Sequence, residues 1–106
     1  MRDMPMNETD VYDISEIRNR LDPVFRENGV KKAVLFGSYA KGGARPRSDV
    51  DIMVDSGLRG LEFMRLIDYV REVLQKDIDL VDVHYIKEGS PVEQEIKQTG
   101  VQIYGE

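Results

Sequence analysis

The chain has 106 residues, with 20 acidic and 15 basic side chains, one histidine and no cysteine. This length predicts a single domain over residues 1–106 with one modest core, too small for a catalytic domain plus a separate substrate-binding domain. The net charge of −5 and the lack of a basic, aromatic-interleaved stripe argue against stable nucleic-acid binding, and the lack of cysteine argues against a disulfide-stapled secreted fold.

The amino-terminal part of the sequence predicts one helix and no membrane segment. No apolar stretch approaches the roughly 18 residues of a spanning helix and no apolar signal-peptide core is visible, so we expect a soluble, cytoplasmic protein. The first dozen residues are expected to be loosely ordered. Apolar residues at helical spacing predict a helix over residues 14–28, which Pro23 should kink or split and Asn28-Gly29 should end.

Two short strands flank a glycine-rich loop in the middle of the chain. The apolar run 32–36 ends at Gly37, as a buried strand does when it enters a tight turn. The loop over residues 39–48 contains two glycines and a proline, so it should not be helical throughout. Alternating apolar residues then predict a second strand over residues 49–54.

The second half of the chain predicts a long helix, two strands and a short helix between those strands. The third strand is expected over 78–83 and the last over 101–104, with a helix from Ser90 to Gly100 between them. The predicted fold class is therefore α/β (α+β), a small mixed β-sheet of about four strands flanked by helices, with the active face at the ends of the first three strands. The long helix carries a broad apolar stripe that we expect to pack on the sheet: Leu61, Phe63, Met64, Leu66, Ile67, Val70, Val73 and Leu74.

The most informative feature is a pair of carboxylates at the start of the second predicted strand. Side chains alternate between the faces of a strand, so Asp49 and Asp51 share a face with their Cα atoms roughly 6.5 Å apart. Two adjacent anions raise each other's pKa unless a cation lies between them. Oxygen ligands without cysteine favour Mg²⁺, with Mn²⁺ as the alternative, and such a pair can hold two ions about 3.5–4 Å apart.

The turn and loop before this pair supply groups that suit phosphate binding. Gly37 can present bare backbone to a ligand, and the residues after it add hydroxyl groups and positive charge. A Gly-Ser turn or an Asp-x-Asp pair is usually structural when it occurs alone, so the prediction depends on their conjunction. That conjunction suits phosphoryl or nucleotidyl transfer, with a nucleotide-binding set of Gly37, Ser38, Lys41, Arg45, Arg47 and Ser48.

Residues 34–54 resemble the signature of the DNA polymerase β-like nucleotidyltransferase superfamily, and the short length resembles its minimal nucleotidyltransferase (MNT) branch. The resemblance extends over about residues 14–104. It implies the polymerase β-like nucleotidyltransferase fold, with ATP as substrate, the triphosphate gripped by Gly37 and Ser38, and two Mg²⁺ ions ligated by the Asp-x-Asp pair. Tyr39 departs from the pattern, because an arginine is frequent at this position in relatives and one phosphate-side contact depends on it.

In that superfamily a third carboxylate from a later strand completes the site. The resemblance selects Asp79 for this role. Alternation places Asp82 on the opposite face of the third strand, and Asp77 would keep the face but lie at the edge, so both stay open as alternatives. The predicted catalytic and metal-binding set is Asp49, Asp51 and Asp79.

Free-standing MNT proteins commonly pair with HEPN-domain ribonuclease toxins. The resemblance therefore implies an antitoxin that transfers AMP from ATP to a tyrosine hydroxyl of such a partner. Two alternatives stay open: an antitoxin that only binds, against which the filled acidic positions argue, and a transferase acting on a small molecule or an RNA end, against which the small size argues. His84 is a lone imidazole and is expected to be structural or solvent-facing.

Overall fold

The computed structural model describes residues 11–105 of the chain. Four strands form one sheet in the order β3-β2-β1-β4. The elements in chain order are α1 (Ile14–Glu27), β1 (Lys32–Phe36), α2 (Ser38–Lys41), β2 (Val50–Asp55), α3 (Gly60–Leu74), β3 (Ile78–Asp82), the 3₁₀ turn η1 (Val83–Tyr85), α4 (Pro91–Thr99) and β4 (Val101–Tyr104).

The sheet is mixed because one of its three strand pairings is parallel and the other two are antiparallel. β1 pairs antiparallel with both β2 and β4, whereas β2 and β3 are parallel and are joined through α3. Parallel neighbours need such a crossover, while the antiparallel β1–β2 pair is joined by the loop that begins with α2. The four-stranded mixed sheet flanked by helices that the sequence predicts is confirmed.

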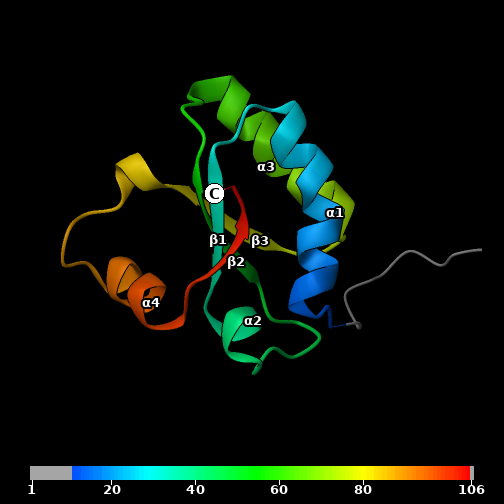
Figure 1. Cartoon of the computed structure of the whole chain (residues 1–106), viewed down its shortest axis with the longest axis vertical. Helices are drawn as coiled ribbons and strands as arrows, with labels where there is room; N and C mark the ends of the chain where they lie inside the picture. Colours follow the sequence, from blue (N-terminus) through cyan, green and yellow to red (C-terminus); the bar gives the residue numbers. More distant parts are fainter. Residues whose placement is uncertain (1–10, 106) are drawn as a thin grey trace, which may run out of the picture.

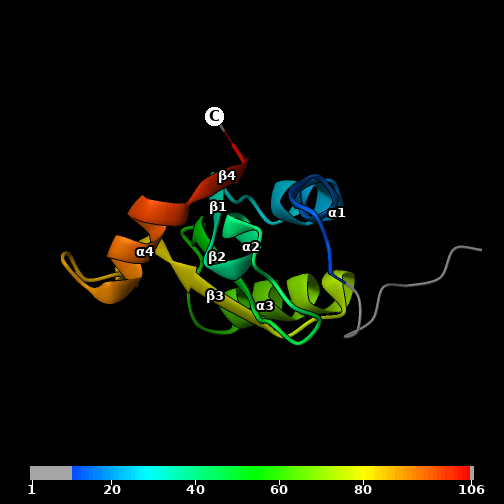
Figure 2. The same ribbon diagram turned by 90° about the horizontal axis from the view of Figure 1, so that it is seen from below.

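Helices cover the two faces of the sheet unequally. α1 and α3 lie together on one face, α4 lies on the other, and α2 sits at one end of the strands (Figure 1). Figure 2 shows the same division from below, with the strands between the α1–α3 layer and α4. In β2 the alternation is strict, since Val50, Ile52 and Val54 are fully buried and Asp51 is only partly buried. The apolar side of β2 therefore faces the core, and its acidic side faces away from it.

α1 is continuous, so the predicted split at Pro23 is wrong. Pro23 is exposed, and water can reach the carbonyl group that loses its helical partner there. Leu21 and Phe25, on either side of it, are fully buried and hold both halves of the helix on the sheet. The helix ends at Asn28, as the sequence predicts.

The apolar stripe of α3 is narrower than predicted. Leu66, Val70 and Leu74 are fully buried, but Leu61 is 75% exposed and Met64 is 60% exposed. A helical period identifies the direction of the buried face but not its width, because the width depends on how far the neighbouring elements extend. The expectation that Leu61 and Met64 belong to the core is wrong.

The amino-terminal segment is tied to the domain from Tyr12 onward. The expected looseness of the first dozen residues falls mainly on residues 1–10, which lie outside the described range. Tyr12 is 3% exposed, and its hydroxyl group donates a hydrogen bond of 2.7 Å to the Leu74 carbonyl. Among the described residues, no helix is both long and apolar enough to cross a membrane.

Candidate active site

The Gly37 turn and the Asp51 carboxylate face each other across the β1–β2 pair. The register aligns Phe36 with Asp51, so the turn that follows β1 lies beside the start of β2. Gly37 has φ +73° and ψ −150°, a conformation that is almost restricted to glycine. A Cβ atom at this position would lie 2.3 Å from Oδ2 of Asp51. The absence of a side chain is therefore what allows the turn and the carboxylate to approach.

The parallel β2–β3 pair brings a second carboxylate to the same place. Asp51 and Asp79 are partners in the register of these neighbouring strands. Because the side chains of paired residues point to the same face, both carboxylates leave the sheet on the side opposite α1 and α3. Asp49 directly precedes β2 and is exposed, as is Asp79, whereas Asp51 is partly buried. The three predicted carboxylates are thus brought together around Asp51.

Burial and the clustering of negative charge raise the pKa of Asp51. Its pKa is raised to about 6 by burial first, and then by the charges of Asp79, Asp49 and Glu95. Glu95 comes from α4, which lies on this face of the sheet. A carboxylate that is both desolvated and surrounded by anions favours either a proton or a cation beside it.

The donor set at this place fits a hard divalent cation. It consists of carboxylate oxygens from neighbouring strands, with excess negative charge and no sulfur ligand. Within residues 11–105, no three carboxylate or imidazole groups already converge on a single point. The site therefore has the chemistry that suits Mg²⁺, with Asp49 and Asp79 exposed to solvent beside the partly buried Asp51.

The loop between the two strands carries the predicted cationic residues on its outside. Lys41, Arg45 and Arg47 are all exposed. Ser48 instead closes the loop on itself: its Oγ accepts a hydrogen bond of 2.9 Å from the Arg45 amide, and its own amide donates to the Arg45 carbonyl. The Ser48 side chain therefore stabilises the loop. The exposed side chains of Lys41, Arg45 and Arg47 can turn toward an anionic ligand.

A buried lysine fastens this loop to the sheet. Lys76 is 4% exposed, and its Nζ donates a hydrogen bond of 2.9 Å to the carbonyl of Pro46, between Arg45 and Arg47. The loop is thereby held near β3, whose first residue follows Lys76 by two positions.

Removing this ammonium group should loosen the loop. For Lys76→Met, which keeps most of the alkyl stem, we expect unfolding to be easier by about 1–3 kcal/mol because the Pro46 carbonyl loses a buried donor. Urea denaturation measures the loss, and hydrogen exchange should show faster exchange over residues 42–49. Lys32→Met, at an exposed lysine of β1, is the matched control. Unchanged exchange in the loop would contradict the anchoring role.

Tyr39, the departure from the family pattern, belongs to the core. It is 4% exposed and packs with the buried apolar residues beneath α2. Burial raises the pKa of its phenol. The side chain therefore points into the protein, and no phosphate-side contact comes from this position.

Asp82, one of the alternatives for the third carboxylate, lies on the other face and is fully engaged there. Its Oδ2 accepts hydrogen bonds from the amide and the hydroxyl group of Ser56, at 3.2 and 2.6 Å. Its Oδ1 accepts from the His84 amide at 3.0 Å and lies 2.8 Å from Nδ1 of the same residue. Burial alone would raise the pKa of Asp82, but these hydrogen bonds outweigh it and hold the pKa below its ordinary value. His84 contacts Asp82 with its Nδ1, and its side chain is mostly exposed, which agrees with the expectation of a structural or solvent-facing imidazole.

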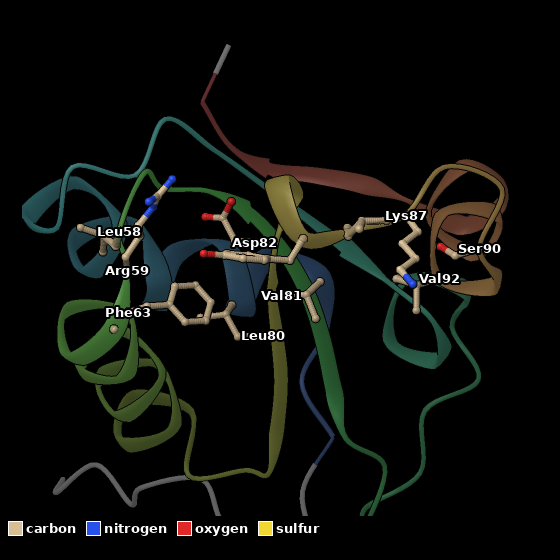
Figure 3. Close-up of a pocket in the computed structure, with 12 residues that line it drawn as sticks. Leu58, Arg59, Phe63, Leu80, Val81, Asp82, Lys87, Ser90 and Val92 are labelled. Carbon is tan, nitrogen blue, oxygen red and sulfur yellow. The ribbon is translucent and has the colours of Figure 1, made fainter.

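Figure 3 shows Asp82 among the residues that line an apolar pocket of about 600 Å³. Leu58, Arg59 and Phe63 line one side of the pocket, and Lys87, Ser90 and Val92 line the other. None of Asp49, Asp51 and Asp79 lines it. The pocket is thus separate from the carboxylate cluster.

Sequence reasoning missed two residues of α4 that reach the site. Glu95 contributes to the raised pKa of Asp51, and Thr99, one turn further on, accepts a hydrogen bond of 3.0 Å from the Gly37 amide through Oγ1. The spacing of four residues places both on one face of a helix. No local pattern assigns that face to the site, because the position of α4 is set by its packing on the sheet.

Comparison with known proteins places the chain in a family. The model of the family "Polymerase beta, Nucleotidyltransferase" matches residues 19–106. A "putative protein adenylyltransferase" of Methanocaldococcus jannaschii is 37% identical over 75 residues, which cover 69% of this chain and 81% of the relative. The protein adenylyltransferase MntA of Thermococcus cleftensis is 40% identical over 65 residues, or 58% of this chain and 64% of that protein.

Solved structures show the same relationship. A chain of a toxin–antitoxin crystal structure with AMP-PNP superposes with a TM-score of 0.71 at 30% identity, covering 84% of this chain and 73% of that one. A chain of the complex between a tri-AMPylated HEPN toxin of Shewanella oneidensis and an MNT antitoxin gives a TM-score of 0.65 at 26% identity, covering 88% and 73%. The fold, the position of the Gly37 turn beside Asp51 and the family match agree, and the protein belongs to the polymerase β nucleotidyltransferase family.

Proposed function

We propose that this protein is a Mg²⁺-dependent adenylyltransferase that transfers AMP from ATP to a hydroxyl group of a partner protein. We further propose that the partner is a HEPN-domain toxin, which the protein neutralises as its antitoxin. The observation that carries the proposal is the juxtaposition of the Gly37 turn with Asp51 and Asp79 on neighbouring strands. The relatives named as protein adenylyltransferases and the tri-AMPylated HEPN toxin complex support the choice of AMP and of the acceptor.

The three carboxylates have different roles in the proposed site. Asp49, Asp51 and Asp79 would hold the two Mg²⁺ ions, with Mn²⁺ as a possible substitute. Bound Mg²⁺ neutralises the triphosphate and lowers the pKa of a coordinated hydroxyl group. Asp51 is the partly buried member and lies against Gly37, so its carboxylate is the most firmly placed of the three. Asp79 is exposed, so an acceptor group could reach it.

The turn and the loop hold the nucleotide. Ser38 begins α2 directly after the Gly37 turn, and Lys41, Arg45 and Arg47 are free to contact the phosphate oxygens. The acceptor oxygen forms a bond to the α-phosphorus atom while the bond from that atom to the bridging oxygen breaks, and pyrophosphate leaves. Asp79 orients the acceptor hydroxyl group and takes up its proton. Positioning and charge neutralisation supply most of the rate enhancement.

A label-transfer assay tests this function. The tagged chain, with the proteins it captures from its own lysate, receives α-labelled ATP and Mg²⁺ beside the Asp49→Asn/Asp51→Asn double variant. We expect label on a HEPN-domain protein only with the unmodified chain, and mass spectrometry should locate AMP on a tyrosine. A HEPN partner that is captured but never labelled would indicate an antitoxin that only binds. Label on RNA or on a small molecule instead would contradict a protein acceptor.

A further inference from the structure

Thr99 connects α4 to the Gly37 turn through a hydroxyl group whose geometry is fixed. Oγ1 of Thr99 accepts a hydrogen bond of 3.0 Å from the Gly37 amide and donates one of 2.8 Å to the Glu95 carbonyl. A hydroxyl group has one proton, and Thr99 donates it to the Glu95 carbonyl oxygen. Oγ1 is therefore committed as an acceptor toward Gly37 and holds the direction of that N–H group.

The end of α4 that carries Thr99 is itself firmly placed. At Gly100, the next residue, a Cβ atom would lie 2.9 Å from Cγ1 of Val34 and 2.5 Å from the Ile96 carbonyl oxygen. β4 then begins at Val101, which pairs with Leu35 of β1. The last turn of α4 is thus pressed against β1 and fixed in register with it, so Thr99 stands at a defined height above the sheet.

The Gly37 backbone contacts Thr99 through its N–H group and Asp51 through its Cα atom. Its N–H group is taken by Thr99, and its Cα faces the Asp51 carboxylate so closely that a Cβ atom would lie 2.3 Å from Oδ2. The N–H group of Gly37 is therefore not a free donor for phosphate, contrary to the expectation that this turn presents bare backbone. The geometry of the turn instead brings the Gly37 Cα against the Asp51 carboxylate and places Ser38 at the start of α2.

From this arrangement we infer that Thr99 is a positioning residue for the nucleotide site. The inference rests on the proposed function, because it assigns the Gly37 turn to the triphosphate. Without the hydroxyl group, the Gly37 amide has no partner in the described part of the structure, and the peptide group before it can rotate. The turn then no longer holds Ser38 and Asp51 in one arrangement, and the nucleotide loses a preorganised site.

Thr99→Val removes the hydroxyl group and keeps the shape of the side chain. We expect the affinity for AMP-PNP with Mg²⁺, measured by calorimetry, to fall about tenfold, within the range seen for supporting residues behind a binding group. Hydrogen exchange at the Gly37 amide should become about tenfold faster or more, since this proton loses its acceptor. Thr99→Ser restores the hydroxyl group and should recover most of both properties.

Ser90→Ala is the matched control, because it weakens the same helix at its other end. The Ser90 side chain caps α4 by accepting from the Glu93 amide, and it does not contact Gly37. Ser90→Ala should lower the melting temperature and leave both the AMP-PNP affinity and the Gly37 amide close to those of the unmodified chain. An equal loss of affinity in Thr99→Val and Ser90→Ala would overturn the inference, as would an unchanged Gly37 amide in Thr99→Val.

The same measurements separate this inference from the proposed function. If the unmodified chain binds AMP-PNP but labels no protein, the proposed acceptor is wrong, and the Thr99 series still decides the positioning role. If the unmodified chain binds no AMP-PNP, both the assignment of the nucleotide site and the role of Thr99 are overturned.

Discussion

Replacing Asp51 with asparagine is expected to abolish transfer and at the same time to stabilise the metal-free protein. The carboxylate lies between Asp49, Asp79 and the Gly37 turn, so its loss removes the central member of the proposed metal-binding set. We expect AMP transfer to fall by more than about 100-fold, the upper value found when only an outer partner of a metal site is removed. Initial rates of label transfer at saturating Mg²⁺ measure this effect.

The gain in stability follows from the raised pKa of Asp51. The folded-state pKa is about 6 against an ordinary value of 3.8, so the folded protein binds a proton more readily than the unfolded chain. This contribution to stability is complete below about pH 3.8 and is lost as the pH rises through about 6. Unscreened, the shift is worth about 3 kcal/mol, and solvent around the partly exposed group reduces it to about 1–2 kcal/mol.

Asp51→Asn should therefore be more stable than the unmodified protein at pH 7.5 in EDTA, and the difference should shrink toward zero at pH 4. Urea denaturation at the two pH values measures it. Asp77→Asn is the control, because this exposed residue before β3 is the alternative that the sequence left open. It should change neither transfer nor stability appreciably. Loss of transfer in Asp77→Asn with full transfer in Asp79→Asn would reassign the third carboxylate.

Gly37→Ala should strongly destabilise the protein and also abolish nucleotide binding. The backbone conformation of Gly37 is strained for any other residue, and the new Cβ atom would overlap Oδ2 of Asp51. We expect a loss of more than about 2 kcal/mol in the free energy of unfolding, together with loss of nucleotide binding. Thermal denaturation and calorimetry with AMP-PNP report the two effects.

Two comparisons separate the causes of that loss. Gly42→Ala introduces a Cβ atom at φ +85° with no heavy atom within 4 Å, so it should show backbone strain alone, about 1 kcal/mol. In an Asp51→Ala background the clashing oxygen is absent, and Gly37→Ala should cost less than in the unmodified chain by at least about 1 kcal/mol. Additive effects of the two substitutions would show that the contact between Gly37 and Asp51 is not what restricts this position.

Local patterns were sufficient for the parts of the site that are close in sequence. The strand, the Gly37 turn and the Asp-x-Asp pair lie within one antiparallel pairing, and their register follows from the alternation of apolar residues in β2. Alternation places both Asp77 and Asp79 on the face of Asp51; the resemblance selects Asp79, and the register that pairs Asp79 with Asp51 comes from the structure. The separation of Asp82 from this site also follows from alternation.

What the sequence left undetermined depends on packing between distant elements. Thr99 and Gly37 are 62 residues apart, and nothing in the local pattern of α4 indicates that its polar face meets the turn after β1. The exposure of Leu61 and Met64 likewise depends on where neighbouring elements end. Continuity of α1 through Pro23 required knowing that this residue lies on the solvent side of the helix.

The position of β4 has a consequence for the order in which the protein folds. Among the described residues β4 is the last strand, yet its partner is β1, a central strand of the sheet that precedes it by more than 60 residues. Pairings of such high sequence separation close large loops and form late. On the ribosome, the Gly37 turn would emerge long before the segment that holds it in place. The carboxylates of the proposed metal site would be translated before β4, and the Gly37 turn would reach its final arrangement only after α4 and β4 have docked on β1.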